Sequence, residues 1–157
     1  VPESVTGIEL LERVKIDDLY FQTTGGGITF GGGESLLHAA FIRHFRGICP
    51  EQWRIRVETS LAVPAELAEI AVGAADDFIV DCKDMDPGIY GQYTGGDAER
   101  MRENLRLLIH AVGTDHIYVR VPLIPEYNTA EDQERSVKAL QQMGIKHIER
   151  FSYVRRE

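Results

Sequence analysis

A glycine-rich segment beside a single carboxylate is the part of this sequence best suited to binding a small molecule. Residues 25–35 read Gly-Gly-Gly-Ile-Thr-Phe-Gly-Gly-Gly-Glu-Ser, so a short β-forming run is followed by three glycines and Glu34. A loop without side chains lets the backbone approach a ligand closely, and the Glu34 carboxylate can accept hydrogen bonds from an ammonium group or a ribose. The segment therefore predicts a small-molecule site at the end of a strand.

Polar residues also end the other expected strands. Glu58-Thr59-Ser60 ends one strand, Asp81-Cys82-Lys83 ends the next, and Arg120 lies on another. The carboxyl ends of parallel strands meet at one rim, where ligands bind. Charges inside a small sheet are costly unless they are paired or bound to a ligand. Either Asp81 pairs with Lys83 and Glu58 with Arg120, or the rim holds a charged, zwitterionic ligand, which we favour because polar groups recur on four strands.

Alternating β and α patterns position these residues. Capping boxes, glycine stops and apolar periodicity predict helices over 6–14, 34–45, 64–71, 97–113 and 129–144, and strands over 27–30, 54–58, 77–81, 116–121 and 146–151. Residues 83–96, which hold one proline and four glycines, are expected to form a polar loop. Strands joined by helices pair in parallel through right-handed crossovers. The pattern predicts one α/β domain with a barrel-like or open parallel sheet.

Composition excludes several classes of function. A length of 157 residues fits a single domain. The net charge of -8 argues against non-specific nucleic-acid binding, which needs a basic face, and no apolar run of about 18 residues predicts a membrane span. With only Cys49 and Cys82 there is no disulfide framework and no metal-ligand spacing, so we expect a cytoplasmic protein. The five histidines are scattered and do not predict a zinc site.

Six motifs follow one another along the chain. They are residues 25–36, which read GGGITFGGGESL, then Glu58-Thr59-Ser60, and then residues 81–87, 93–95, 120–128 and 144–149. In order and spacing they resemble the motifs of the activating enzymes of glycyl-radical enzymes, within the radical S-adenosylmethionine superfamily, and the pyruvate formate-lyase activase type gives the nearest pattern. The corresponding family patterns are G-G-G-V-T-F-S-G-G-E-P-L, E-T-S/N-G, D-L-K-x-M-D-P, Y-T-G, R-x-P-L-I-P-x-Y-N and G-V-K-R-I-E.

This resemblance implies a partial (β/α)6 barrel with S-adenosylmethionine along its top rim. It assigns Gly32, Gly33 and Glu34 to the methionine amino group, and it places four residues around the carboxylate and the ribose: Thr59, Asp81, Lys83 and Arg120. In the family, a [4Fe–4S] cluster cleaves the sulfonium reductively to a 5′-deoxyadenosyl radical. That radical takes a hydrogen from a backbone glycine of a partner, the glycyl-radical enzyme.

The chain departs from the family pattern at the cofactor rim and at the cluster. Gly31 and Ser35 stand where the family has Ser and Pro, and Val154 stands where a His is expected near the adenosyl group. The family's cluster-binding C-x3-C-x2-C loop lies on its first strand. Cys49 and Cys82 do not supply the thiolates of such a cluster.

The chain begins at Val1 rather than Met. Together with the missing cysteine loop, this leads us to expect that residues 1–157 are a single fragment of a radical S-adenosylmethionine core domain whose first strand is missing. We expect such a fragment to be inactive for want of the cluster, to bind S-adenosylmethionine weakly, and to self-associate through its exposed sheet edge.

Two other interpretations stay open. A non-catalytic module with the same fold would bind a partner through residues 83–96. A phosphate-binding barrel would use the glycine loop as an anion site, which the neighbouring Glu34 carboxylate opposes by repulsion.

Overall fold

Five parallel strands form one curved sheet. The computed structural model describes residues 4–153, and the strands pair in the order β1-β2-β3-β4-β5, each parallel to its neighbour. The strands are β1 (Gly27–Phe30), β2 (Arg54–Thr59), β3 (Asp77–Asp81), β4 (Ile117–Leu123) and β5 (His147–Ser152). The expected strands are confirmed, with ends that shift by one or two residues.

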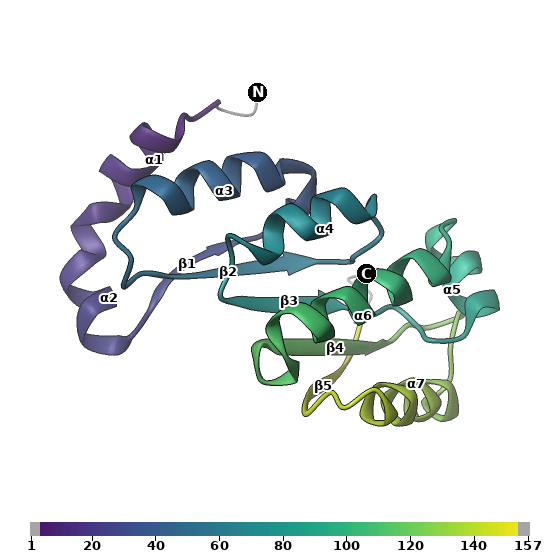
Figure 1. The fold of residues 1–157 in the computed structure, drawn as a ribbon. Coiled ribbons are helices and arrows are strands. Elements are labelled where there is room, and N and C mark those ends of the chain that lie inside the picture. Colours follow the sequence, from purple (N-terminus) through teal and green to yellow (C-terminus); the bar gives the residue numbers. More distant parts are fainter. Residues whose placement is uncertain (1–3, 154–157) are drawn as a thin grey trace.

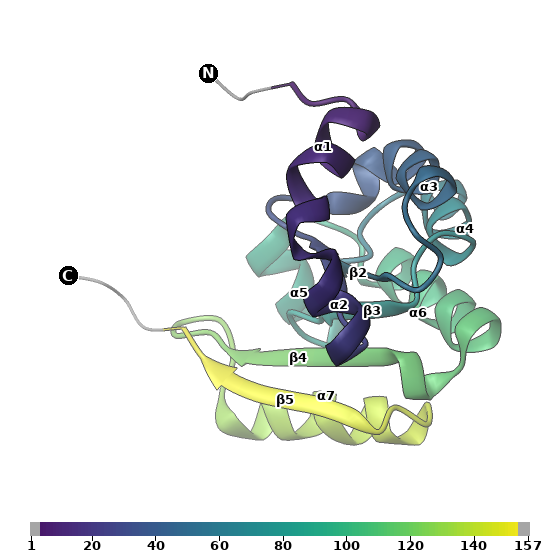
Figure 2. The same cartoon turned by 90° about the vertical axis from the view of Figure 1, so that its left-hand side faces the viewer.

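Helices α3, α4, α6 and α7 cover one side of this sheet. The helices of the described residues are α1 (Gly7–Val14), α2 (Asp18–Thr24), α3 (Ala39–Ile48), α4 (Ala65–Val72), α5 (Pro87–Thr94), α6 (Ala98–Val112) and α7 (Ala130–Gln142), with 3₁₀ turns η1 (Lys15–Asp17), η2 (Ser35–His38) and η3 (Thr114–His116). Figure 1 shows α3, α4, α6 and α7 following one another across the sheet, from the β1 side to the β5 side. In the end view of Figure 2, the sheet curves like part of a barrel wall with these helices outside it.

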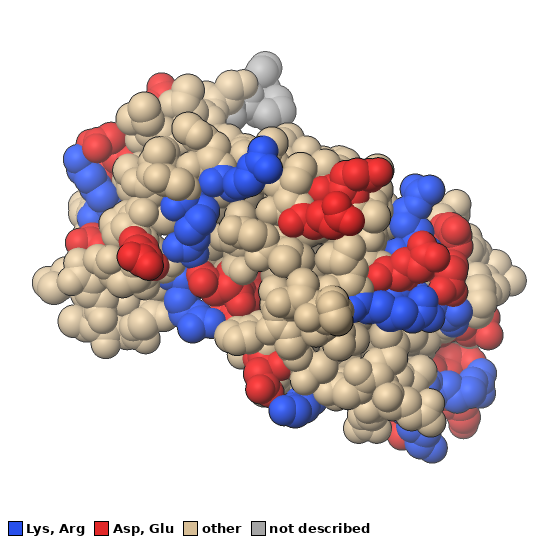
Figure 3. Space-filling model, viewed as in Figure 1, with Lys and Arg blue, Asp and Glu red and all other residues tan. Residues whose placement is uncertain are grey.

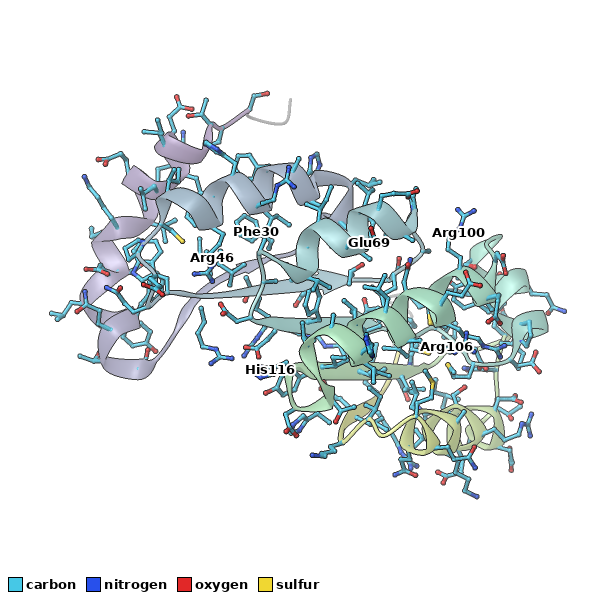
Figure 4. All side chains as sticks on the ribbon, in the orientation of Figure 1. Phe30, Arg46, Glu69, Arg100, Arg106 and His116 are labelled. Carbon is cyan, nitrogen blue, oxygen red and sulfur yellow. The ribbon has the colours of Figure 1, made fainter. Side chains whose placement is uncertain are left out.

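The strands carry apolar residues on one face and polar residues on the other, because successive side chains alternate. Toward the helices, the buried core takes from the strands Ile55, Val57, Phe78, Val80, Val119 and Val121. Figure 4 shows Phe30 between β1 and helix α3, where its ring meets that of Phe45 at 5.7 Å in an edge-to-face contact. Among residues 4–153 no helix layer covers the opposite face, so its charged side chains remain within reach of a ligand.

Capping residues set the helix starts as expected. Thr6 and Glu9 form a capping box at α1, Thr129 and Asp132 form another at α7, and the Asp97 side chain accepts from the backbone of α6. Each cap satisfies amide groups that the first turn of a helix leaves without partners. The helix order, and with it the parallel topology, follows from these local signals.

The expectation of a polar loop over residues 83–96 is wrong. Helix α5 occupies most of it, since the Asp86 carboxylate accepts from the amides of Gly88 and Ile89 at 2.8 and 3.0 Å and Pro87 takes the first helical position. Tyr90 anchors the helix and is 1% exposed. The Asp-Pro pair is a helix start signal that glycine content obscured.

The expected helix over residues 34–45 also differs, because it begins as the 3₁₀ turn η2 and becomes α-helical only at Ala39. Helix α2 was not expected from the sequence. It ends at Gly25, whose φ is 64°, and its Phe21 packs edge-to-face on Trp53 at 5.1 Å. Helix α2 thus ends at the first glycine of the segment, two residues before β1 begins.

Candidate functional site

A cleft of about 450 Å³ lies at the carboxyl ends of β1, β2 and β3. Its lining residues are Gly32, Gly33, Glu34, Glu58, Thr59, Ser60, Asp81 and Lys83. Six of the seven residues named from the sequence therefore meet in one place. The seventh, Arg120, lines a neighbouring hollow of about 320 Å³ on β4 and β5, from which its Nη1 lies 3.4 Å from Glu58 Oε1.

The glycine loop opens toward free space. Gly32 and Gly33 have φ angles of 83° and 58°, and a Cβ built on either would meet no atom within 4 Å. Residues with side chains are strained in this backbone conformation, so glycine is required here by the turn and not by crowding. Gly31 is different, because a Cβ there would lie 2.9 Å from Glu58 Oε2. The loop therefore leaves open space above the cleft that a ligand can occupy.

The Glu34 carboxylate ties the glycine loop to the end of β2. Its Oε1 accepts from the Thr59 hydroxyl at 2.6 Å and the Leu36 amide at 3.1 Å. Its Oε2 accepts from the Ser60 amide and hydroxyl at 2.9 and 2.6 Å. Because a carboxylate has about four acceptor positions, these four donors occupy both oxygens. An ammonium ligand would have to share an oxygen with one of the two hydroxyls.

The charges of the rim pair with one another and stay partly exposed. Lys83 Nζ lies 3.6 Å from Asp81 Oδ2, and the two side chains are 18% and 38% exposed. Lys83 also donates to the Tyr153 hydroxyl at 2.7 Å. Partial burial opposes the charge on Lys83, but the hydrogen bond to Tyr153 and the Asp81 carboxylate outweigh it and raise the pKa of the ammonium. Lys83 is therefore a permanent cation in the cleft at neutral pH.

The loop after β2 holds a left-handed residue, which sequence reasoning missed. Leu61 has a φ of 58° and is fully buried. Asn104 on α6 donates to the carbonyls of Leu61 and Val63 at 2.9 and 2.8 Å, and the Leu61 amide donates to Thr59 Oγ1 at 2.9 Å. The buried amide of Asn104 thus holds in place the turn that presents Thr59 to Glu34. A single polar residue on an otherwise apolar helix face was the available signal.

The two cysteines do not fit an iron–sulfur cluster. Cys82 is fully buried on the helix side of β3, and desolvation raises the pKa of its thiol to about 12. Cys49 ends α3, is 9% exposed, and has a pKa raised chiefly by burial. Cys82 therefore packs in the core, and Cys49 lies in the bend that follows α3, directly before Pro50. Among residues 4–153, no cluster of His, Cys, Asp and Glu could hold a metal ion.

Ion pairs at the other end of the sheet are structural. The Asp77 carboxylate, 3% exposed, accepts from Arg54 Nη2 at 2.8 Å and lies 3.1 Å from His116 Nδ1. Burial alone would raise the pKa of Asp77, but the hydrogen bonds from His116 and Arg54 and the charges of Arg54 and Arg56 lower it. Figure 4 shows His116 at the turn that precedes β4. This pairing supports the strands at the end remote from the cleft.

Solved structures with related folds were found for this chain. A domain of a pyruvate-formate lyase-activating enzyme from Bacteroides vulgatus aligns with a TM-score of 0.55 and 20% identity, over 82% of this chain and 99% of that one. Streptococcus suis SuiB, solved with S-adenosylmethionine bound, aligns with a TM-score of 0.68 and 15% identity, over 99% of this chain and 35% of that one. Together with the curved parallel sheet, they confirm the expected α/β fold of a partial barrel.

Sequence relatives are more specific. The chain is 32% identical to the (2S)-3-sulfopropanediol dehydratase activating enzyme of Klebsiella oxytoca over 80% of its own length and 39% of that protein. It is 32% identical to the pyruvate formate-lyase 2-activating enzyme of Escherichia coli over 90% of its length and 49% of that protein. The corresponding values for the benzylsuccinate synthase activating enzyme of Thauera aromatica are 28%, 92% and 43%.

These relatives show which proteins the chain is homologous to. It is a homologue of the activating enzymes of glycyl-radical enzymes, as the motif resemblance indicated. The chain spans between about two-fifths and one half of the length of the curated relatives it matches. No protein-family model matches it.

Val154, which stands where the family has a His, lies outside the described residues 4–153. Within that range, none of the helices has the length and apolar character needed to cross a membrane.

Figure 3 shows acidic and basic side chains interspersed on the face seen in Figure 1. That surface gives no support to non-specific nucleic-acid binding.

Proposed function

We propose that the cleft binds S-adenosylmethionine, as part of an activating enzyme of a glycyl-radical enzyme. The observation that carries the proposal is the charge of the lining, which holds three carboxylates, from Glu34, Glu58 and Asp81, and one ammonium, from Lys83. S-adenosylmethionine presents an ammonium, a sulfonium and a carboxylate, so its charges complement this set. A phosphate would instead face three carboxylates, which disfavours the anion-binding interpretation.

Each residue then has a role that follows from its position. The loop of Gly32 and Gly33 leaves room for the methionine backbone, and Glu34 sets the loop against β2 and contributes a shared oxygen to the ammonium. Lys83 would donate a hydrogen bond to the ligand carboxylate, because its raised pKa keeps the ammonium charged at neutral pH. Asp81 and Thr59 offer acceptors to the ribose hydroxyls, and Arg120 acts from the side by orienting Glu58.

Bound S-adenosylmethionine would supply a sulfonium that an electron donor can cleave. The thiols of Cys49 and Cys82 are buried and remain protonated at neutral pH because burial raises their pKa. We therefore propose that residues 1–157 provide the cofactor cradle and are inactive without cluster thiolates from elsewhere. Reading the encoded sequence on the N-terminal side of Val1 tests this point: a C-x3-C-x2-C loop there supports the activase, and its absence favours a partner-binding module.

Titration calorimetry tests the cradle directly. We expect S-adenosylmethionine to bind the 157-residue chain at millimolar concentration, and Lys83→Ala to weaken binding by about tenfold or more, because a hydrogen bond to a charged group is lost. Lys146→Ala is the matched control, since Lys146 forms an exposed ion pair with Asp115 at 2.8 Å outside the cleft. Absence of binding heat, or equal losses in both variants, contradicts the proposal.

We also propose a partner protein and a cellular location. A glycyl-radical enzyme is the partner implied by the activating enzymes named above, and the cytoplasm is the compartment implied by two unpaired thiols. Self-association through the free side of β1 is a separate proposal, because β1 pairs only with β2 among the described strands. Sedimentation across a hundredfold range of protein concentration tests it, and a monomer throughout contradicts it.

A further inference from the structure

A buried carboxylate lies directly behind the cofactor rim and forms no ion pair with a Lys or Arg within residues 4–153. Asp84 is 2% exposed and occupies the open position of the D-L-K-x-M-D-P pattern. Its Oδ1 accepts from the Asp86 amide at 2.8 Å and from the Ser136 hydroxyl at 3.0 Å. Its Oδ2 accepts from Asn128 Nδ2 at 3.1 Å. A carboxylate held this deeply by neutral donors is costly to bury, so its retention calls for a specific role.

These contacts connect three separate segments of the chain. Ser136 belongs to helix α7 and also accepts from the Met85 amide at 2.8 Å. Asn128 belongs to the loop between β4 and α7, and it also donates to the Pro122 carbonyl at 3.1 Å and accepts from the Ile124 amide at 2.6 Å. Asp84 itself follows Lys83 in the chain. The network therefore ties the segment after β3 to the segment after β4.

The network lies where the hydrogen bonds between the two strands end. At the rim, the Cys82 amide donates to the Arg120 carbonyl at 3.0 Å, and no ladder continues beyond it. Without further contacts, the segment that carries Lys83 would be held on one side only. Beyond the last backbone hydrogen bond between β3 and β4, the buried hydrogen bonds of Asp84 and Asn128 hold the two segments together.

We propose that Asp84 is a positioning residue for the S-adenosylmethionine cradle, acting through Asn128 and Ser136 to hold Lys83 at a fixed distance from the β4 side of the rim. The proposal rests on the proposed function, since it concerns the same cleft. Asp84 touches no cleft space itself. Its effect on a ligand is transmitted through the position of Lys83 and the segment that follows β3.

The hydrogen-bond network requires an acceptor atom at both the Oδ1 and the Oδ2 position of residue 84. In an Asp84→Asn variant, the amide group would face either Asn128 Nδ2 or the Asp86 amide, both of which are donors. Asn128 cannot turn to relieve the conflict, because its oxygen is engaged by Ile124. The substitution is nearly isosteric, so it disturbs the network without opening a cavity.

The test compares two buried carboxylates, Asp84 in the segment after β3 and Asp77 at the first position of β3. Asp84→Asn acts behind the cleft, and the control Asp77→Asn acts at the remote end of β3, where Asp77 pairs with Arg54. Thermal unfolding first establishes a temperature at which all variants are folded. Titration calorimetry with S-adenosylmethionine and hydrogen exchange at the Met85, Asp86 and Cys82 amides then follow under that condition.

We expect Asp84→Asn to weaken S-adenosylmethionine binding by about 2- to 30-fold, the range for residues that act without touching the ligand. Exchange at the three amides should become faster, while Asp77→Asn leaves both readouts at the wild-type level. Equal losses of affinity in the two variants, or unchanged exchange in Asp84→Asn, overturn the proposal. If the wild-type chain binds no ligand, the proposed function fails, and the exchange measurement still decides whether Asp84 orders the rim.

Discussion

Replacing Glu34 by Gln is the sharpest test of how the glycine loop is held. The carboxylate accepts four hydrogen bonds, from Leu36, Thr59 and both polar groups of Ser60. A glutamine has one oxygen, so it can satisfy two of these donors, and its amide group then faces the other two. The change keeps the size of the side chain and removes only acceptors and charge.

The cost follows from the bonds that are lost. Each hydrogen bond to a charged group contributes about 1.5–3 kcal/mol, which puts two lost bonds at roughly 3–6 kcal/mol as an upper bound. Glu34 and Ser60 are only partly buried, so water can replace part of the loss. We therefore expect about 2 kcal/mol, which lowers the melting temperature of a domain of this size by about 4–8 °C.

Urea and thermal unfolding, followed by circular dichroism, measure this change. Glu58→Gln is the matched control, because Glu58 lines the same cleft but makes a single pair with Arg120 at 3.4 Å and is 37% exposed. Such a pair contributes less than about 1 kcal/mol. If Glu34→Gln destabilises the protein no more than Glu58→Gln does, the carboxylate does not hold the loop and the reasoning is refuted.

Three further expectations can be checked with the same material. Gly33→Ala should cost about 1–2 kcal/mol in unfolding experiments although nothing crowds the position, because an alanine is strained at a φ of 58°; a neutral change would show that the turn is not rigid. The folded pKa of Asp77 lies below its ordinary value of 3.8, so its stabilisation is complete above that pH and is lost as the pH falls through the folded pKa. Acid titration of the melting temperature should therefore show a smaller drop in Asp77→Asn than in the wild type. Cys82, buried and with a pKa of about 12, should react with a thiol reagent at pH 8 only after unfolding, and rapid labelling of the native protein at this position would contradict its burial.

Much of the fold and most of the cleft could be predicted from local patterns. The capping boxes at Thr6 and Thr129 and the β-branched runs of the strands are signals within a few residues, and such signals survive in the folded chain. Helix α5 shows where such patterns mislead, because the glycines of residues 83–96 predict a loop although Asp86-Pro87 starts a helix.

The residue types and order of the sequence determined the parallel sheet, the rim at its carboxyl ends and the kinship with activating enzymes. Only the tertiary structure decided what each rim residue contacts. Glu34 is engaged by donors from the next strand, Lys83 reaches Tyr153, and Asp84 is bound by Asn128 and Ser136. The physical reason is that these partners are separated by between 26 and 70 positions in the chain, and no local pattern encodes a contact of that range. Their meeting depends on the register of the sheet and the packing of α7.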